Sequence, residues 1–279
     1  MIRKGMKAVH ALPTERYPKA RPIFDGYDHQ LIVSSVIDGN TRGEIYVDDI
    51  EDPKTGIIYG IGFEVLCSGD PRDASFHREI ANLFVHKLIP NARTYGMPGI
   101  NVYFPSESWK RALQWALSDR LELMTVRKRF YTFDPANRSP RKEIQTQSGL
   151  KQIDESLLND DLLNNRDALL QWIRLSWRSI GDFARKGIGY CIVEDGTIAS
   201  WCLSVFASGN QLEFALFTDE AFRNKGYAKM VSAACVEYCL ENGRLPLWVC
   251  DDDNLSSIRV AEKIGFRKTL DFHVLQVKL

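Results

Sequence analysis

The chain has 279 residues, of which 44% are hydrophobic and 26% charged, and its 36 basic residues are balanced by 36 acidic ones. This composition is typical of a folded globular protein and excludes extensive disorder. A net charge of zero argues against nucleic acid as a partner, because nucleic acid binding requires a strongly basic surface.

Membrane, secretion and metal signals are weak. The longest apolar stretch, residues 56–68, contains Glu64 and is too short to cross a bilayer. Residues 1–13 form a poor secretory signal because their apolar run is short and interrupted. The six cysteines contain no CxxC pair, and four of them lie in apolar strand-like or helix-like segments, which is typical of buried free thiols. The five histidines lack ligand spacing, so we expect no metal site. We therefore expect a cytoplasmic protein that binds neither a membrane nor a metal.

The first half of the chain predicts a mixed α+β domain. Strand-like runs occur at 30–37, 44–47, 56–66 and 124–133. Helical spacing occurs at 75–88 and at 106–117, the second with Ser106 as N-cap. The polar segment 134–147 contains two prolines, which predicts a linker between a domain at 1–133 and another at 148–279.

The second half predicts a regular order of elements. A helix at 166–186 precedes an antiparallel meander with strands at 190–193, 197–206 and 211–218. The helices and strands that follow alternate at 226–240, 245–250, 254–264 and 269–277. This order predicts an α+β fold with a mixed sheet. The first half repeats part of it, which leaves a diverged internal duplication open.

The segment Arg223–Ala228 (RNKGYA) lies between an apolar strand and a long helix. The first backbone N–H groups of a helix are unpaired and carry partial positive charge, which favours a bound phosphate. Gly226 allows a close approach to the backbone, and Arg223 and Lys225 add positive charge. The alternative is an ordinary strand-to-helix loop with two solvated cations.

A second motif follows at residues 254–266, NLSSIRVAEKIGF, where Asn254 is a natural N-cap. The combination of R-x-x-G-x-A opening a helix with N-x-x-S-x-x-x-A-x-K-x-G-F resembles the GNAT superfamily of acyl-CoA-dependent N-acetyltransferases. This resemblance covers residues 166–279. The whole chain also resembles a two-part GNAT group with a degenerate, GNAT-like N-terminal half. The resemblance implies a central mixed sheet that splays between strands 211–218 and 245–250, with acetyl-CoA in the gap.

The resemblance also implies which residues hold acetyl-CoA. The backbone of Phe217 and Thr218 would pair with the pantetheine arm. Asn254 would face the pantetheine or the thioester, with Ser257 one turn further along the helix. Main-chain N–H groups of one loop and helix start would cradle the diphosphate: Arg223, Asn224, Lys225, Gly226, Tyr227 and Ala228.

Glu213 is the one carboxylate inside the apolar strand 211–218. An amine with a pKa near ~10.4 must lose a proton before it attacks a thioester, and a partly desolvated Glu213 is suited to accept it. Many GNAT enzymes have a carboxylate in this role on this strand; a solvent-facing Glu213 without function is the alternative. Ala261 stands where the family often has a Tyr that protonates the leaving thiolate, so the resemblance assigns no general acid.

These features predict an N-acetyltransferase that moves an acetyl group from acetyl-CoA to a primary amine by direct attack in a ternary complex. The acceptor is expected to be a small molecule or a peptide, and a homodimer is left open. One alternative is a CoA-binding sensor or partner module with weak or absent activity, which Ala261 favours. Another is a structural pseudoenzyme whose N-terminal half occupies the acceptor cleft.

Overall fold

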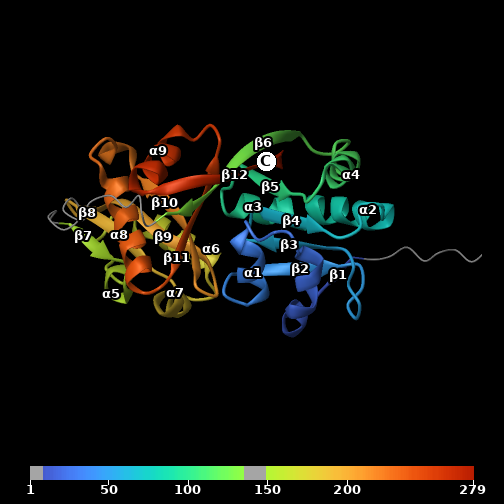
Figure 1. Ribbon diagram of the computed structural model, residues 1–279, viewed down its shortest axis with the longest axis horizontal. Helices are drawn as coiled ribbons and strands as arrows, with labels where there is room; N and C mark the ends of the chain where they lie inside the picture. Colours follow the sequence, from blue (N-terminus) through green and yellow to red (C-terminus); the bar gives the residue numbers. More distant parts are fainter. Residues whose placement is uncertain (1–8, 135–148) are drawn as a thin grey trace, which may run out of the picture. The chain divides into compact units, whose positions relative to one another are not determined.

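The computed structural model describes residues 9–134 and 149–279, which divide into two compact units (Figure 1). Unit 1 comprises the described residues up to Val126 together with His273–Leu279, and unit 2 those from Arg127 to Phe272. Of the expected linker 134–147, only Asp134 lies among the described residues. The expected limits at 133 and 148 therefore stay a prediction, while the compact units divide at other residues.

Unit 1 contains a mixed sheet in which four strands pair antiparallel in sequence order. They are β1 (His10–Ala11), β2 (Gly43–Val47), β3 (Gly56–Gly60) and β4 (Glu64–Ser68). Next, β4 pairs parallel with β5 (Gly99–Tyr103), and β5 pairs antiparallel with the end of β12 (Phe266–Lys278). The predicted strand 56–66 is thus two strands joined by a turn.

The helices of unit 1 confirm two predictions and extend one of them. They are η1 (Thr14–Phe24), α1 (Leu31–Ile37), α2 (Ala74–Leu83), the π-helical η2 (Phe84–Leu88), α3 (Ile89–Thr94) and α4 (Glu107–Leu117). The predicted helix 75–88 therefore continues to Thr94. Ser106 caps α4 by accepting a hydrogen bond from the Trp109 N–H at 3.3 Å, as expected.

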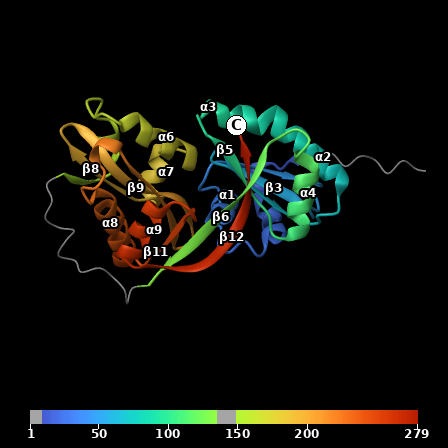
Figure 2. The ribbon, with the colours of Figure 1, turned by 90° about the horizontal axis from the view of Figure 1, so that it is seen from above.

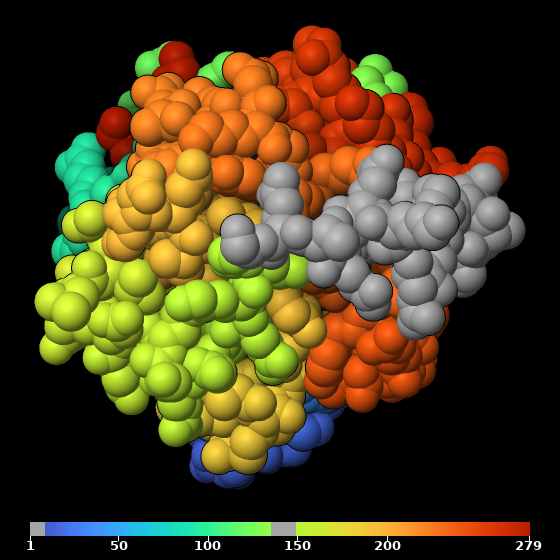
Figure 3. Space-filling model, turned by 90° about the vertical axis from the view of Figure 1, so that its left-hand side faces the viewer, coloured from blue at the N-terminus to red at the C-terminus, as the bar shows by residue number. Residues whose placement is uncertain are grey.

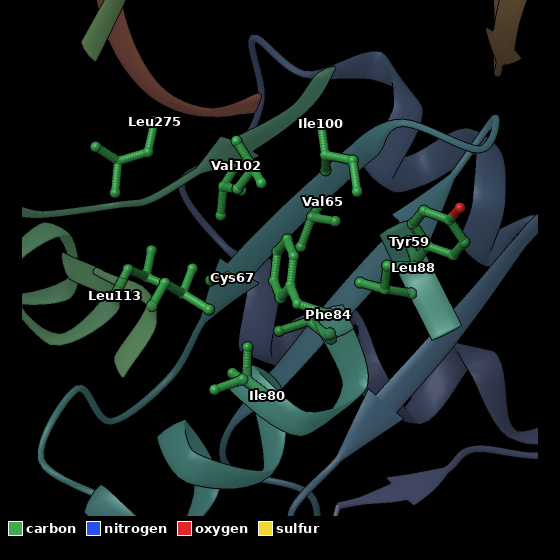
Figure 4. Close-up of a cluster of buried hydrophobic side chains, with 14 of the residues drawn as sticks. Tyr59, Val65, Cys67, Ile80, Phe84, Leu88, Ile100, Val102, Leu113 and Leu275 are labelled. Carbon is green, nitrogen blue, oxygen red and sulfur yellow. The ribbon is translucent and has the colours of Figure 1, made fainter. Parts of the chain in front are cut away.

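The core of unit 1 lies between the sheet and α2, η2 and α4 (Figure 4). Ile80 and Phe84 are four residues apart, which places both side chains on one face of the helix. They are fully buried together with Val65 of β4 and Leu113 of α4. This spacing is the helical signal that the sequence carried.

The prediction of a strand at 30–37 is wrong, because residues 31–37 form α1. All of this helix is buried except Ser34, so its apolar run has no polar face to reveal a helical period. Tertiary contacts favour the helix: Ile32 and Val36 lie against Gly60 and Gly43, where a β-carbon would come within 2.8 Å of either side chain. Two glycines on neighbouring strands thus make room for α1 on the sheet.

Unit 2 contains four strands predicted for the second half, a short strand at 150–152 that was not predicted, and part of the strand predicted at 124–133; the predicted strand 269–277 is β12. The strands of unit 2 are β7 (Leu150–Gln152), β8 (Gly189–Glu194), β9 (Thr197–Ser208), β10 (Gln211–Thr218) and β11 (Leu245–Asp251), with the part of β6 (Leu123–Phe133) from Arg127 onward. β7 to β10 pair antiparallel, β10 pairs parallel with β11, and β11 pairs antiparallel with β6.

The helices of unit 2 lie on both faces of this sheet, with α6 and α7 on one side of β9 and α8 on the other (Figure 2). They are α5 (Glu155–Leu158), α6 (Arg166–Ser176), α7 (Ile180–Lys186), η5 (Glu220–Phe222), α8 (Tyr227–Glu241) and α9 (Leu255–Ile264). The single helix predicted at 166–186 is wrong. Trp177 is extended and Ser179 caps a new helix through the Asp182 N–H.

The two units repeat one order of pairing. In each, an antiparallel meander ends in a strand that pairs parallel with the next strand, across a helical connection. That next strand is followed by α4 in unit 1 and by α9 in unit 2. The strands after these helices are exchanged: β6, which follows α4, pairs with β11, and β12, which follows α9, pairs with β5. This repeat is what an internal duplication predicts.

Among the described residues, none of the helices has the length and apolar character needed to cross a membrane.

Candidate functional site

β10 and β11 pair only at their beginnings. Their parallel register runs from Gln211 opposite Leu245 to Glu213 opposite Leu247, and both strands lie wholly within the described residues. Beyond Glu213 they diverge, although β10 continues to Thr218 and β11 to Asp251. A register shift in the β9–β10 pairing between Glu213 and Phe214 marks the point of divergence. The splay expected between these strands is therefore present.

Glu213 lies at this point and is 8% exposed. A solvent-facing Glu213, the alternative considered from the sequence, does not agree with this burial. The carboxylate is thus located where the two strands part, in surroundings from which most water is excluded.

The chain passes from β10 to α8 through η5 and a loop, Arg223–Gly226, that we call the α8 loop. Asp219 caps η5, at the start of this connection, by accepting hydrogen bonds from the Ala221 N–H at 3.0 Å and from Asn165 Nδ2 at 2.9 Å. Asn224 and Gly226 then have φ values of 65° and 82°, in the left-handed region. The α8 loop therefore has a defined turn conformation.

Gly226 is the N-cap of α8 and supplies no side-chain hydrogen bond. A β-carbon at this position would meet nothing within 4 Å, so the space in front of the helix is open. The hydrogen bonds of α8 begin with the Met230 N–H donating to the Gly226 carbonyl. The N–H groups of Tyr227 and Ala228 precede this bond and have no acceptor four residues back within the helix. This end of α8 is suited to bind an anion.

The cations of the α8 loop have partly exposed side chains. Figure 3 shows the orange stretch of the chain, in which this loop lies, forming part of the molecular surface. Arg223 is paired with Glu220 at 3.0 Å, and its side chain is 58% exposed. Lys225, with a side chain 44% exposed, donates to Oε1 of Glu194 at 2.9 Å. Tyr227 donates to Oε2 of the same carboxylate at 2.5 Å. Glu194, at the end of β8, thus joins the residues on either side of Gly226.

These contacts shift the ionisation of all three groups. The hydrogen bonds from Tyr227 and Lys225 hold the pKa of the Glu194 carboxyl below its ordinary value. The same carboxylate raises the pKa of the Lys225 ammonium and that of the Tyr227 hydroxyl. Each group is held in the protonation state it has at neutral pH.

Phe217 and Thr218 end β10 as predicted. Ser200 of β9 donates a hydrogen bond to the Phe217 carbonyl at 2.9 Å, and its oxygen lies 2.8 Å from Oγ1 of Thr218. The Phe217 ring stacks on Trp201 with centroids 5.7 Å apart, yet the residue is 37% exposed. The strand end is therefore tied to β9 and keeps an accessible aromatic face.

Asn254 and Ser257 begin α9 and have structural contacts of their own. Asn254 caps the helix by accepting a hydrogen bond from the Ser257 N–H at 3.1 Å. The Ser257 hydroxyl accepts from Trp248 Nε1 at 2.9 Å, which ties α9 to β11. α8 and α9 pack against each other and begin at the carboxyl ends of the adjacent parallel strands β10 and β11. Ligands of mixed sheets commonly bind at this edge.

Ala261 is fully buried in α9, where the general acid of related enzymes is often found. All six cysteines are free and buried, whereas apolar sequence context predicted burial for four of them. Within 9–134 and 149–279, no group of three or more His, Cys, Asp or Glu is placed to hold a metal ion.

Glu194 is the residue that sequence reasoning missed. It contacts Lys225 and Tyr227, which lie 31 and 33 residues further along the chain, and local sequence spacing does not predict contacts over this separation. The Asp195-Gly196 turn identified β8 and β9 but not the loop facing the end of β8.

Comparisons with known proteins agree with this architecture. A family model described as GNAT acetyltransferase matches residues 21–275. The chain is 28% identical over 271 residues to the uncharacterized N-acetyltransferase YdfB of Bacillus subtilis strain 168, covering 96% of this chain and 98% of that protein.

Two solved structures resemble the chain along most of its length. A GCN5-related N-acetyltransferase-like protein of Streptococcus suis 89/1591 matches with a TM-score of 0.69 at 20% identity, over 95% of this chain and 99% of that one. A tandem GNAT protein from the clavulanic acid biosynthesis pathway matches with a TM-score of 0.56 at 15% identity, over 96% and 97%. Because the family match runs through both units, the chain belongs to the GNAT acetyltransferase family and is an acyltransferase.

Proposed function

We propose that the protein transfers an acetyl group from acetyl-CoA to a primary amine by direct attack in a ternary complex. The observation that carries the proposal is the divergence of β10 and β11 beside the open N-terminus of α8. A gap between parallel strands admits an extended arm, and a helix start binds the anionic end of the same ligand.

In this proposal the main chain from Asn224 to Ala228 binds the diphosphate, and the end of β10 at Phe217 and Thr218 aligns the pantetheine arm. Asn254 and Ser257 border the same edge of the sheet from α9. The residues fit this role because the space in front of Gly226 is open and two cations flank it.

Acetyl-CoA supplies an acetyl group activated as a thioester, and Glu213 handles the proton. The acceptor binds as an ammonium ion; Glu213 accepts its proton directly or through one water, and the free amine attacks the carbonyl carbon. The carbon–sulfur bond then breaks, the thiolate leaves with its electron pair, and the attacking nitrogen releases its second proton to solvent, which leaves the neutral amide. A thiol has a reference pKa of only ~8.5, so this departure does not require a proton donor at the position of Ala261.

The acceptor is a small-molecule or peptide amine. The six free buried thiols are consistent with a reducing, cytoplasmic location.

The proposal is tested with acetyl-CoA and a panel of amines, in which release of free thiol is followed and the acetylated product is identified by mass spectrometry. Amine-dependent thiol release is expected, and it should fall in Glu213→Gln. Thiol release that no amine accelerates would contradict transferase activity.

The second candidate function is a CoA-binding module with little or no transferase activity. It is favoured by Ala261, which is fully buried and leaves its position without a proton donor. Calorimetry separates the two functions: a module binds CoA with the same loop, yet no amine in the panel is acetylated.

A further inference from the structure

One carboxylate occupies the cationic side of the proposed diphosphate site. Glu194 uses a different oxygen for each partner, Oε1 for Lys225 at 2.9 Å and Oε2 for Tyr227 at 2.5 Å. The Lys225 ammonium also lies 5.0 Å from the ring centre of Phe222 and 5.8 Å from that of Tyr227. Its charge is thus already compensated by a carboxylate and two aromatic rings.

This arrangement affects how an anion can bind. The open helix start lies directly after Lys225, because Gly226 is its N-cap. A diphosphate at that position meets backbone N–H groups that can donate hydrogen bonds to it. It also meets Lys225, whose charge is already paired with Glu194. It also meets the negative charge of Glu194 at the same loop, which repels it.

We propose that Glu194 is a counter-charge that an anionic ligand must displace from Lys225, so that Glu194 sets the affinity of the site for the diphosphate of CoA. This inference rests on the proposed function. Glu194 acts through Lys225 and is a positioning residue rather than a catalytic one. Ion pairs between partly exposed side chains are weak in water, so the lysine exchanges one anionic partner for another at low cost. Exchange leaves the Tyr227 bond to hold the carboxylate near the loop.

The test is isothermal titration of the full chain with CoA, comparing wild type with Glu194→Gln. The glutamine keeps the shape and one acceptor oxygen but removes the charge. Because Lys225 is then available to the ligand, Kd should fall at least about fivefold, the lower end of typical coupling between two linked binding events. The released cation should also make binding more sensitive to salt.

Two further variants separate displacement from general electrostatics. Asp195→Asn removes the same charge one residue away, at a position with φ of 48° that asparagine tolerates. It should change Kd less than about twofold, because no hydrogen bond links it to Lys225 among the described residues. In a Lys225→Met background, Glu194→Gln should have a clearly smaller effect, since no cation remains to be released and only the direct repulsion of the ligand by Glu194 is removed. Thermal melts confirm that each variant is folded.

The outcomes are distinct. If wild type does not bind CoA, the proposed function itself is wrong. If wild type binds and Glu194→Gln leaves Kd unchanged or raises it, the displacement is wrong while the proposed function stands. An equal effect of Asp195→Asn, or an undiminished effect of Glu194→Gln in the Lys225→Met background, also overturns the displacement.

Discussion

In each unit a helix follows the last strand of the antiparallel meander, and this helix begins differently in the two units. In unit 1, α2 starts at Asp73, whose carboxylate accepts hydrogen bonds from the N–H groups of Ser75 and Phe76, both at 3.1 Å. In unit 2, α8 starts at Gly226, which has no side chain to offer and faces open space. The Asp73 carboxylate thus supplies an anion at the start of α2, whereas the start of α8 has no such group and can bind an anionic ligand.

The strands before these helices differ in the same sense. In each unit the parallel register contains three pairs, and the third pair contains Leu66 in unit 1 and Glu213 in unit 2. β4 ends two residues later at Ser68, whereas β10 continues to Thr218. Unit 1 therefore has the same topology without a carboxylate at the third pair, a long diverging strand or an open helix start. The comparison teaches that the site depends on a few residues at strand and helix ends, which one copy of a fold can lose while its core persists.

The largest effect is expected from Glu213→Gln. Because the amide cannot accept the proton of the acceptor, kcat should fall about 10²-fold, a usual size for a general base. The affinity for CoA should be nearly unchanged, since Glu213 lies five residues before the end of β10 and the proposed diphosphate site follows that end, in the α8 loop. Steady-state thiol release measures the first quantity and calorimetry the second.

The matched control is Glu64→Gln in unit 1, a strand carboxylate with the same 8% exposure. It should retain kcat within a factor of about two, because the proposed general base, Glu213, belongs to unit 2. Equal losses in both variants would show that burial of a carboxylate, rather than its place in the splay, is what matters, and the contrast between the units would be lost.

The next effect concerns the open helix. Gly226→Asp gives α8 the kind of cap that α2 has and places a negative charge at the anion site. We expect Kd for CoA to rise at least about tenfold, which corresponds to ~1.4 kcal/mol of binding free energy.

Gly226→Asn is its isosteric, neutral partner. Both residues tolerate the left-handed conformation at φ of 82°, so backbone strain is similar in the two variants. The asparagine should weaken binding less than the aspartate, because it lacks the charge. If calorimetry gives the same raised Kd for both, bulk rather than charge repulsion is the cause. If both keep the wild-type Kd, the diphosphate does not bind at this helix start.

Local patterns in the sequence predicted most strands and helices of unit 2 and the residues from which its site is proposed. The α8 loop, the N-cap Asn254 and the alternation of strands and helices are short-range features. Features that depend on distant contacts were not predictable. α1 looked like a strand because packing against Gly43 and Gly60, not polarity, decides its form. Likewise, Glu194 and the exchanged pairing of β6 and β12 depend on residues far apart in the chain.

A smaller effect is expected in unit 1 from Asp73→Ala. Loss of the cap leaves two N–H groups of α2 without their acceptor and should lower the free energy of unfolding by about 1 kcal/mol. Urea denaturation measures the loss, and Ser106→Ala at the start of α4 is the comparison within the same unit. Neither variant should change Kd for CoA. Weaker CoA binding in Asp73→Ala would mean that unit 1 takes part in the site after all.

The smallest effect is expected from removing a phenol. If Tyr227 were the general acid, activity would fall at alkaline pH as its proton is lost. The hydrogen bond to Glu194 raises the pKa of Tyr227, and a raised pKa keeps the proton bound to higher pH. Burial raises the pKa of Tyr131 in the same direction. Between pH 6 and about 9.5, below the ordinary phenol value of ~10, both phenols therefore stay protonated.

Acceptor deprotonation alone should then shape the profile. With a limiting concentration of an alkyl amine of pKa ~10.4, activity should rise along a single limb as the neutral fraction grows. Tyr227→Phe should keep that shape and change kcat by less than about threefold, because the thiolate leaves without a donor. The measurement is the rate of thiol release at each pH for wild type and variant. Because a raised pKa keeps Tyr227 protonated across this window whether or not it is the acid, the size of the rate change decides, and a loss of kcat far beyond threefold in Tyr227→Phe would identify Tyr227 as the proton donor. It would also show that unit 2 holds a general acid in place of the residue that Ala261 replaces.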